Sequence, residues 1–198
     1  KTFVIVGDNG IILTSDNGTN WVSRTSGLTD SLRNVFYGNG TFVASGVGTT
    51  ILSSSDGINW TTRMIEYKKD ESGNWESCCE SRNQQLLTGI YTGSKYLVAG
   101  TNFRDLSNFK YSNYFESSDA VNWSHKYMDT VNETYGIGAA IKDLEFLNNN
   151  YWAIGTGALA KSSDGNTWVK QTVNEFTNKE LYSISYGSDV YVVVGLTD

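Results

Sequence analysis

Short runs rich in β-branched, aromatic and other apolar residues recur along the whole chain, separated by clusters of Gly, Asn, Ser and Asp. The run at 41–46, Thr-Phe-Val-Ala-Ser-Gly, follows a Gly-Asn-Gly turn and has counterparts at 95–100, 150–155 and 190–195. Each counterpart is preceded by another β-rich run across a similar turn, which is typical of a β-hairpin. Helical periodicity is nearly absent. The pattern therefore predicts an all-β chain built from repeated hairpins.

A second motif, Ser-Asp followed after a short interval by Trp, recurs at 15–21, 55–60, 118–123 and 163–168. Together with the preceding hairpin it defines a unit of four strands, illustrated by 31–38, 41–46, 50–55 and 58–63. Four-stranded units that repeat at about 40 residues are typical of a β-propeller. We therefore predict an all-β fold, a β-propeller of four-stranded antiparallel blades, with about four to five blades.

The predicted blades belong to a single domain over residues 1–198, with repeats near 1–25, 31–63, 84–127, 137–172 and 180–198 and an insertion at 64–84. The second strand has one more candidate, at 2–7, than the other three strands have. Two interpretations stay open. Either the chain ends meet, so that the strand near 180–187 completes the N-terminal blade, or the chain is a window from a larger propeller. Lys1 opens directly on an apolar strand, which fits a processed end or an excerpt.

The Ser-Asp-Trp motif has a mechanical explanation. An Asp at the end of a strand accepts hydrogen bonds from backbone N–H groups two residues on, and the following Gly allows the positive φ of a tight turn. The Trp fills the gap between adjacent sheets. We therefore predict structural roles for the four Asp residues and burial between blades for the four Trp residues: Asp16, Asp56, Asp119 and Asp164, and Trp21, Trp60, Trp123 and Trp168.

These motifs resemble the Asp-box (BNR) repeat, S/T-x-D-x-G-x-x-W, of sialidase-like propellers and of many bacterial surface and bacteriophage tail proteins. Residues 14–21 fit the pattern fully, whereas the other three motifs shorten the interval from Asp to Trp by one and Ala120 replaces the glycine. The resemblance implies a propeller fold. Sialidases of this superfamily also use an R-x-P motif, and this chain contains no proline. The resemblance is therefore to a sialidase-like propeller without the sialidase catalytic motif.

Composition narrows the classes of function further. The 15 basic and 21 acidic residues give a net charge of −6, which opposes binding to nucleic acid. No apolar run approaches the length of a membrane helix, so membrane insertion is not expected. His125 is the sole histidine, and we expect an exposed or capping role for it rather than a catalytic one. We expect no metal and no cofactor. The adjacent Cys78 and Cys79 form either two reduced thiols or a vicinal disulfide.

The two largest departures from the repeat are the segments 64–84 and 101–113. In an antiparallel four-stranded blade both connections emerge at the end opposite the Asp motifs, over the same blade. They combine aromatic and cationic residues, which suit sugars and protein interfaces. The predicted ligand-binding residues are Trp75, Arg82, Phe103, Arg104, Lys110 and Tyr114.

These features favour a non-catalytic binding or adhesion propeller that recognises a glycan (carbohydrate) or a cell-surface receptor through the loops opposite the Asp motifs. Its location would be extracellular, at a cell surface or on a virion. One alternative is a structural or receptor-binding propeller of a phage tail or another particle, whose other subunits would be its partners. A second alternative is a glycoside hydrolase, which needs two carboxylates at a fixed separation.

Overall fold

The computed structural model describes residues 1–66, 84–101, 112–128, 140–156, 158–176 and 179–196. The described residues contain no α-helix, and their helical structure consists of the short 3₁₀ turns η1 (Asp8–Gly10) and η3 (Asn174–Phe176). None of the described helices has the length and hydropathy needed to span a bilayer. The chain is therefore built from β-strands, as predicted.

The strands of the described residues form five sheets, numbered here in chain order, and within each sheet the strands joined by hairpins pair antiparallel. Sheet 1 contains β1 (Phe3–Val6), β2 (Ile12–Ser15) and β3 (Val22–Arg24). Sheet 2 contains β4 (Leu32–Gly38), β5 (Thr41–Gly46), β6 (Ile51–Ser54) and β7 (Thr61–Arg63). Sheet 3 contains β9 (Leu86–Tyr91), β10 (Tyr96–Gly100), β11 (Ser112–Ser117) and β12 (Trp123–Met128). Sheet 4 contains β13 (Ile141–Leu147), β14 (Asn150–Gly155), β15 (Ala158–Ser162) and β16 (Val169–Gln171), and sheet 5 contains β17 (Leu181–Gly187) and β18 (Val190–Gly195).

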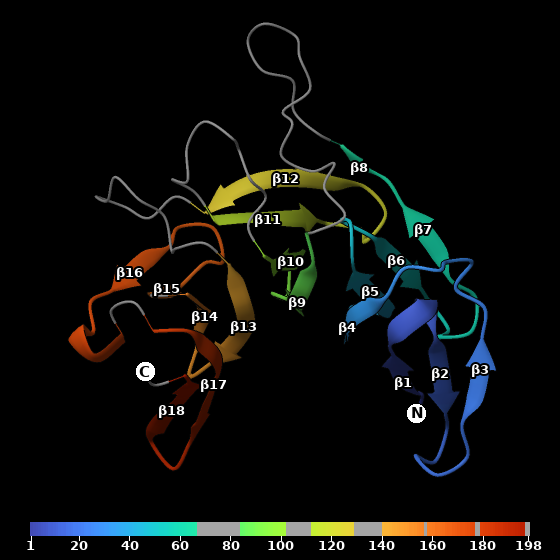
Figure 1. Cartoon of the computed structure of the whole chain (residues 1–198), viewed down its shortest axis with the longest axis horizontal. Coiled ribbons are helices and arrows are strands. Elements are labelled where there is room, and N and C mark those ends of the chain that lie inside the picture. Colours follow the sequence, from blue (N-terminus) through green and yellow to red (C-terminus); the bar gives the residue numbers. More distant parts are fainter. Residues whose placement is uncertain (67–83, 102–111, 129–139, 157, 177–178, 197–198) are drawn as a thin grey trace, which may run out of the picture.

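The sheets follow one another around an arc (Figure 1), and the first strands of neighbouring sheets, β4, β9, β13 and β17, contact each other along its inner side. This arrangement of four-stranded antiparallel blades is a β-propeller, which confirms the predicted fold class. Sheets 1 and 5 lie at the two ends of the arc. There β1 pairs with β2, and β17 pairs with β18 rather than with a strand of sheet 1.

One strand has no counterpart in the repeat. Within the predicted insertion at 64–84, Ile65–Glu66 forms β8, which pairs in parallel with β12 at the outer edge of sheet 3. The chain thus passes from the outer strand of sheet 2 directly onto the outer edge of sheet 3 before the segment 67–83 begins. Sheet 3 is consequently five-stranded.

The core consists of apolar layers between neighbouring sheets. Between sheets 2 and 3 lie Val43, Val98 and Trp123, and between sheets 3 and 4 lie Leu97 and Trp168. Residues of the second strand alternate between the two layers, because successive side chains of a strand point to opposite faces. Each fully buried aliphatic side chain stabilises the fold by roughly 1.5–3 kcal/mol.

The four motif tryptophans are not equally buried, which corrects the sequence-based prediction. Trp123 and Trp168 are 1% and 0% exposed, whereas Trp21 and Trp60 are half-buried. Trp60, Trp123 and Trp168 each pack toward the preceding sheet, whereas Trp21 precedes β3 of sheet 1, the first sheet of the arc. Trp123 gains cover from Ile65 of β8, and Trp168 faces the five-stranded sheet 3. Trp60 faces only the three-stranded sheet 1.

The glycine that ends each second strand also has a structural cause. A Cβ at Gly100 would overlap the carbonyl oxygen of Gln85, which lies just before the first strand of the same sheet. The pairing register shifts at this point, so the two backbones approach closely. Equivalent overlaps occur at Gly46, Gly155 and Gly195. The repeated glycine is therefore required by backbone contact rather than by a turn.

Candidate functional site

The motif turns are closed by a fixed set of hydrogen bonds. In sheet 2, Asp56 Oδ1 accepts the backbone N–H groups of Ile58 and Asn59, both at 2.8 Å. Ser54 Oγ donates to the same oxygen at 2.9 Å and accepts the N–H of Gly57 at 2.9 Å. Turns of the same kind are centred on Asp119 and Asp164. These carboxylates act within their own turns.

In the first turn the acceptor is Asn17 and not Asp16, which corrects the predicted assignment. Asn17 Oδ1 accepts the N–H groups of Thr19 and Asn20, both at 2.9 Å, and Ser15 Oγ donates to it at 3.1 Å. Asp16 is exposed. With Asn17 as the acceptor, all four turns share one frame, Ser-x-Asp/Asn-Gly/Ala-x-x-Trp. The prediction failed because it required a charged residue, whereas an amide oxygen is an equivalent hydrogen-bond acceptor.

The same hydrogen bonds stabilise the ionised form of the turn carboxylates. The backbone N–H of Asn59, aided by its side chain and by Ile58, holds the pKa of Asp56 well below its ordinary value. The N–H groups of Thr167 and Asn166 lower the pKa of Asp164 to about 2. A carboxylate held ionised in this way is a poor proton donor near neutral pH, so these residues are unsuited to general acid catalysis.

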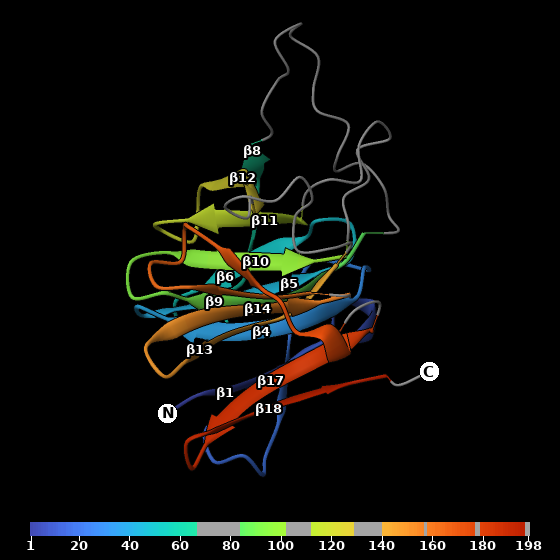
Figure 2. The same cartoon turned by 90° about the vertical axis from the view of Figure 1, so that its left-hand side faces the viewer.

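Most of the predicted ligand-binding residues, Trp75, Arg82, Phe103, Arg104 and Lys110, lie outside the described residues, as do Cys78 and Cys79. The ends of the strands next to these segments lie within the described residues. The N–H of Thr101 donates to the Gln85 carbonyl at 2.9 Å, and the N–H of Gln85 donates to Thr101 Oγ1 at 2.8 Å. These residues lie at the end of sheet 3 opposite the turn at 117–123, since β10 runs away from that turn (Figure 2). Both ends of segment 102–111 and the end of segment 67–83 that precedes Gln84 therefore join this end of sheet 3, whereas segment 67–83 begins after Glu66, which lies beside Ser124 near the motif turn.

Tyr114 was predicted as a ligand-binding residue, and the structure buries it. It is 4% exposed and packs in the layer between sheets 3 and 4 with Leu97 and Trp168. On β11 it pairs with Ala99 and Lys126, and the alternation of the strand directs its side chain toward sheet 4. Tyr114 is a packing residue.

The turn end of sheet 3 carries a groove with a volume of about 480 Å³. Glu116 is part of its lining and pairs with Lys95 at 2.7 Å and Lys126 at 3.3 Å. Burial opposes the ionisation of Glu116, but the hydrogen bond and charge of Lys95, followed by those of Lys126, hold its pKa below the ordinary value. Lys95 also contacts Asn166 in the turn of sheet 4. The groove lining comprises Ser94, Lys95, Glu116, Ser117, Ser118, Asn122, Trp123 and Ser124.

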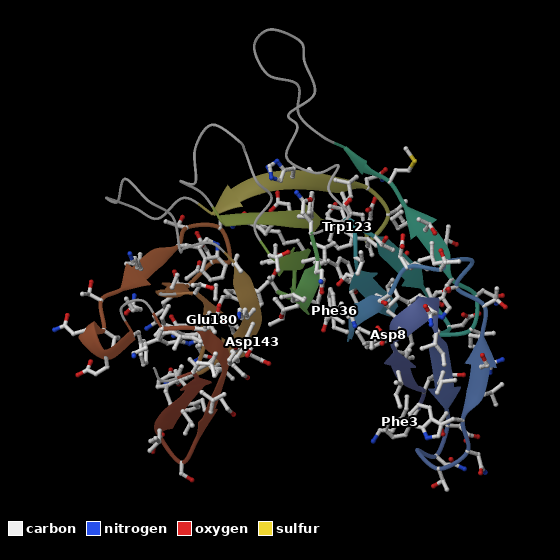
Figure 3. The ribbon with its side chains drawn as sticks, viewed as in Figure 1. Phe3, Asp8, Phe36, Trp123, Asp143 and Glu180 are labelled. Carbon is white, nitrogen blue, oxygen red and sulfur yellow. The ribbon has the colours of Figure 1, made fainter. Side chains whose placement is uncertain are left out.

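The inner strands present a second group of carboxylates (Figure 3). Asp143 accepts hydrogen bonds from Ser183 Oγ at 2.8 Å and from the N–H of Ile184 at 3.1 Å, so it ties sheet 4 to sheet 5. Two residues on, burial and then the charge of Asp143 raise the pKa of Glu145. Glu180 pairs with Lys142 at 2.9 Å. Glu145 therefore keeps its proton to a higher pH than an ordinary glutamate carboxyl group does.

Two further sequence-based expectations concern histidine and metals. His125 is 2% exposed and packs against Phe115 with ring centroids 5.5 Å apart, so the expectation that it is exposed is wrong. The reason is its position in the middle of β12, on the face that the sheet core covers. Within the described residues, no group of three or more His, Cys, Asp or Glu side chains is placed to hold a metal ion.

No protein-family model and no curated protein matches the chain. Among solved structures, YCF48 bound to a D1 peptide is 20% identical, and the match covers 97% of this chain and 70% of that chain at a TM-score of 0.40. An α-L-arabinofuranosidase from Fusarium graminearum is 12% identical to this chain. The match covers 98% of this chain and 62% of that chain, with a TM-score of 0.49. A Bombyx mori β-fructofuranosidase is 13% identical, and the match covers 93% of this chain and 47% of that chain with a TM-score of 0.45. Sequence identities and TM-scores this low assign neither a family nor an activity to the chain.

Proposed function

We propose that the chain is a non-catalytic Asp-box propeller that recognises a glycan or another cell-surface ligand, at the end of sheet 3 opposite the motif turns. The observation that carries the proposal is that one end of segment 67–83 and both ends of segment 102–111 join the end of sheet 3 opposite the motif turns. Long connections in a compact repeat array are uncommon unless they are functional or disordered. The turns at the other end use their carboxylates internally.

The residue types in the two segments suit this role. They include Trp75 and Phe103, whose ring faces can stack on sugars, and Arg82 and Arg104, which can donate hydrogen bonds to hydroxyl or carboxylate groups. The buried Tyr114 is not part of the set. A surface of this composition fits a neutral or anionic saccharide presented outside a cell or on a virion.

A glycan array provides the test. The 198-residue chain is compared with a variant in which 67–82 is replaced by a short Gly/Ser bridge and with Asp164→Ala as a matched control. The chain should bind a subset of glycans, the bridge variant should lose that signal while keeping the β-type circular dichroism spectrum, and Asp164→Ala should retain it. Full binding by the folded bridge variant would place recognition elsewhere and refute the proposal.

A glycoside hydrolase is the second candidate, and Glu145 is the observation that favours it. Its raised pKa, next to the carboxylate of Asp143, matches the acid of a two-carboxylate mechanism. However, Asp143 is engaged by Ser183 and Ile184. Incubation with a panel of nitrophenyl glycosides decides between the candidates. We expect no release of nitrophenol, whereas hydrolysis that Glu145→Gln abolishes without loss of folding would establish the enzyme.

A further inference from the structure

The two sheets at the ends of the arc expose apolar faces. On β18, Val192 and Val194 are 55% and 52% exposed, and on β1, Phe3 and Ile5 are 46% and 45% exposed. The two faces lie on separate arms of the arc (Figures 1 and 3), where Phe3 marks the face of sheet 1. Contiguous exposed apolar surface of this kind marks interaction sites.

The β18 face has the register of a blade-to-blade interface. When the second strands are aligned on their final glycines, 46, 100, 155 and 195, Val192 occupies the position of Val43, Leu97 and Trp152. Those three residues are 0%, 0% and 8% exposed, and each packs against the following sheet. Val194 likewise corresponds to the buried Ala99 and Ile154. The β18 face therefore has the residue pattern of a face that packs against a following sheet.

The β1 face has the opposite register. When β1 is aligned on Gly7, Ile5 occupies the position of Ala44, Val98 and Ala153, which are fully buried against the preceding sheet. Phe3 similarly corresponds to Tyr96 and Tyr151, which also pack on the preceding sheet. Trp21 is half-buried and occupies in its motif the position of Trp123 and Trp168, which pack on the preceding sheet. The β1 face is therefore the half that packs onto a preceding sheet.

We propose that the β18 face of one copy of this chain binds the β1 face of a second copy, head to tail. The contact continues the blade-to-blade packing already present between sheets 2, 3 and 4, with Val192 and Val194 of one copy against Phe3 and Ile5 of the next. Such an interface is heterologous, because different surfaces of two identical chains meet, and it builds a ring or a filament. The proposal does not depend on the proposed glycan binding.

Analytical ultracentrifugation of the 198-residue chain over a range of concentrations tests this interface. The chain should form dimers and larger species as concentration rises. Ile5→Asp and Val192→Asp should each be monomeric, because a charge would be buried against an apolar surface. A mixture of the two should give a 1:1 dimer that grows no further, since each variant keeps one intact face. Ile58→Asp, at an exposed position of a turn, is the matched control and should associate like the parent chain.

Three outcomes would overturn the proposal: a monomeric parent chain at every concentration, association that survives Ile5→Asp or Val192→Asp, and a monomeric mixture of the two variants. If the β18 face and the β1 face of the same chain met and closed the arc, the parent chain would be monomeric at every concentration. Circular dichroism establishes that each variant is folded. Should either fail to fold, Phe3→Asp and Val194→Asp replace them as the pair, with the same expectations.

Discussion

At the scale of single residues, the motif turns depend on an oxygen acceptor and not on charge. Asp56 and Asp164 each accept two backbone N–H groups, and Asn17 does the same with a neutral amide. The sequence predicted the structural role of the motif, because its spacing recurs. It did not reveal Asn17 as the acceptor, because Asp16 beside it fits a pattern defined by acidic residues.

Substitution of Asp164 tests this distinction. Asp164→Ala removes the acceptor of the Asn166 and Thr167 N–H groups and should lower the free energy of unfolding by about 1 kcal/mol, a value limited by solvent screening of an exposed carboxylate. Asp164→Asn should lose less than half as much, because Asn17 shows that an amide can close the turn. Urea unfolding measures both. Equal losses for the two variants would show that the charge itself is required.

The lowered pKa of Asp164 predicts a pH dependence. Because the folded pKa is about 2 against an ordinary 3.8, the contribution of the carboxylate is complete above about pH 3.8 and declines as the pH falls toward 2. The stability difference between the parent chain and Asp164→Asn should therefore shrink between pH 5 and pH 2.5. Urea unfolding at the two pH values provides the measurement. A difference that stays constant would indicate that Asp164 has the same pKa in the folded and unfolded states.

At the scale of elements, hairpins and four-stranded units were predictable because turn residues and the short β-rich runs between them are local signals. The strand β8 was not, because it has two residues and pairs with β12, which lies far away in the sequence. The candidate site was only partly predictable for a similar reason. The strand ends near Gln85 and Thr101 follow from topology, whereas the burial of Tyr114 depends on which face of β11 meets sheet 4.

The close approach at the ends of the second strands gives a prediction at this scale. Gly100→Ala would force a methyl group against the Gln85 carbonyl, so it should cost about 2 kcal/mol or more. Gly40→Ala is the matched control, because a methyl group there has open space around it and only the positive φ of +79° opposes it, a cost of about 1 kcal/mol. Thermal and urea unfolding should rank the variants in this order. The reverse order would mean that the backbone relaxes freely at Gly100.

At the scale of the whole molecule, stability comes from layers between sheets, and the layers at the ends of the arc are incomplete. Trp168→Ala should cost about 3–5 kcal/mol, because the side chain is fully buried between two sheets. Trp21→Ala should cost less than half of that, since its indole is only half-buried on sheet 1. Chemical unfolding compares the two. At a concentration at which the chain is monomeric, similar losses would contradict this ranking, whereas at higher concentrations the proposed association through the β1 face should raise the cost of Trp21→Ala.

The central claim is that the motif turns at one end of the sheets have structural roles, whereas the ligand binds at the opposite end. Amide hydrogen exchange, with and without the glycan that gives the strongest array signal, tests this division directly. The account predicts slower exchange in 67–83 and 102–111 and next to them at Gln85 and Thr101, with exchange unchanged at 15–21, 54–60, 117–123 and 162–168. Protection confined to those four turns would contradict the account.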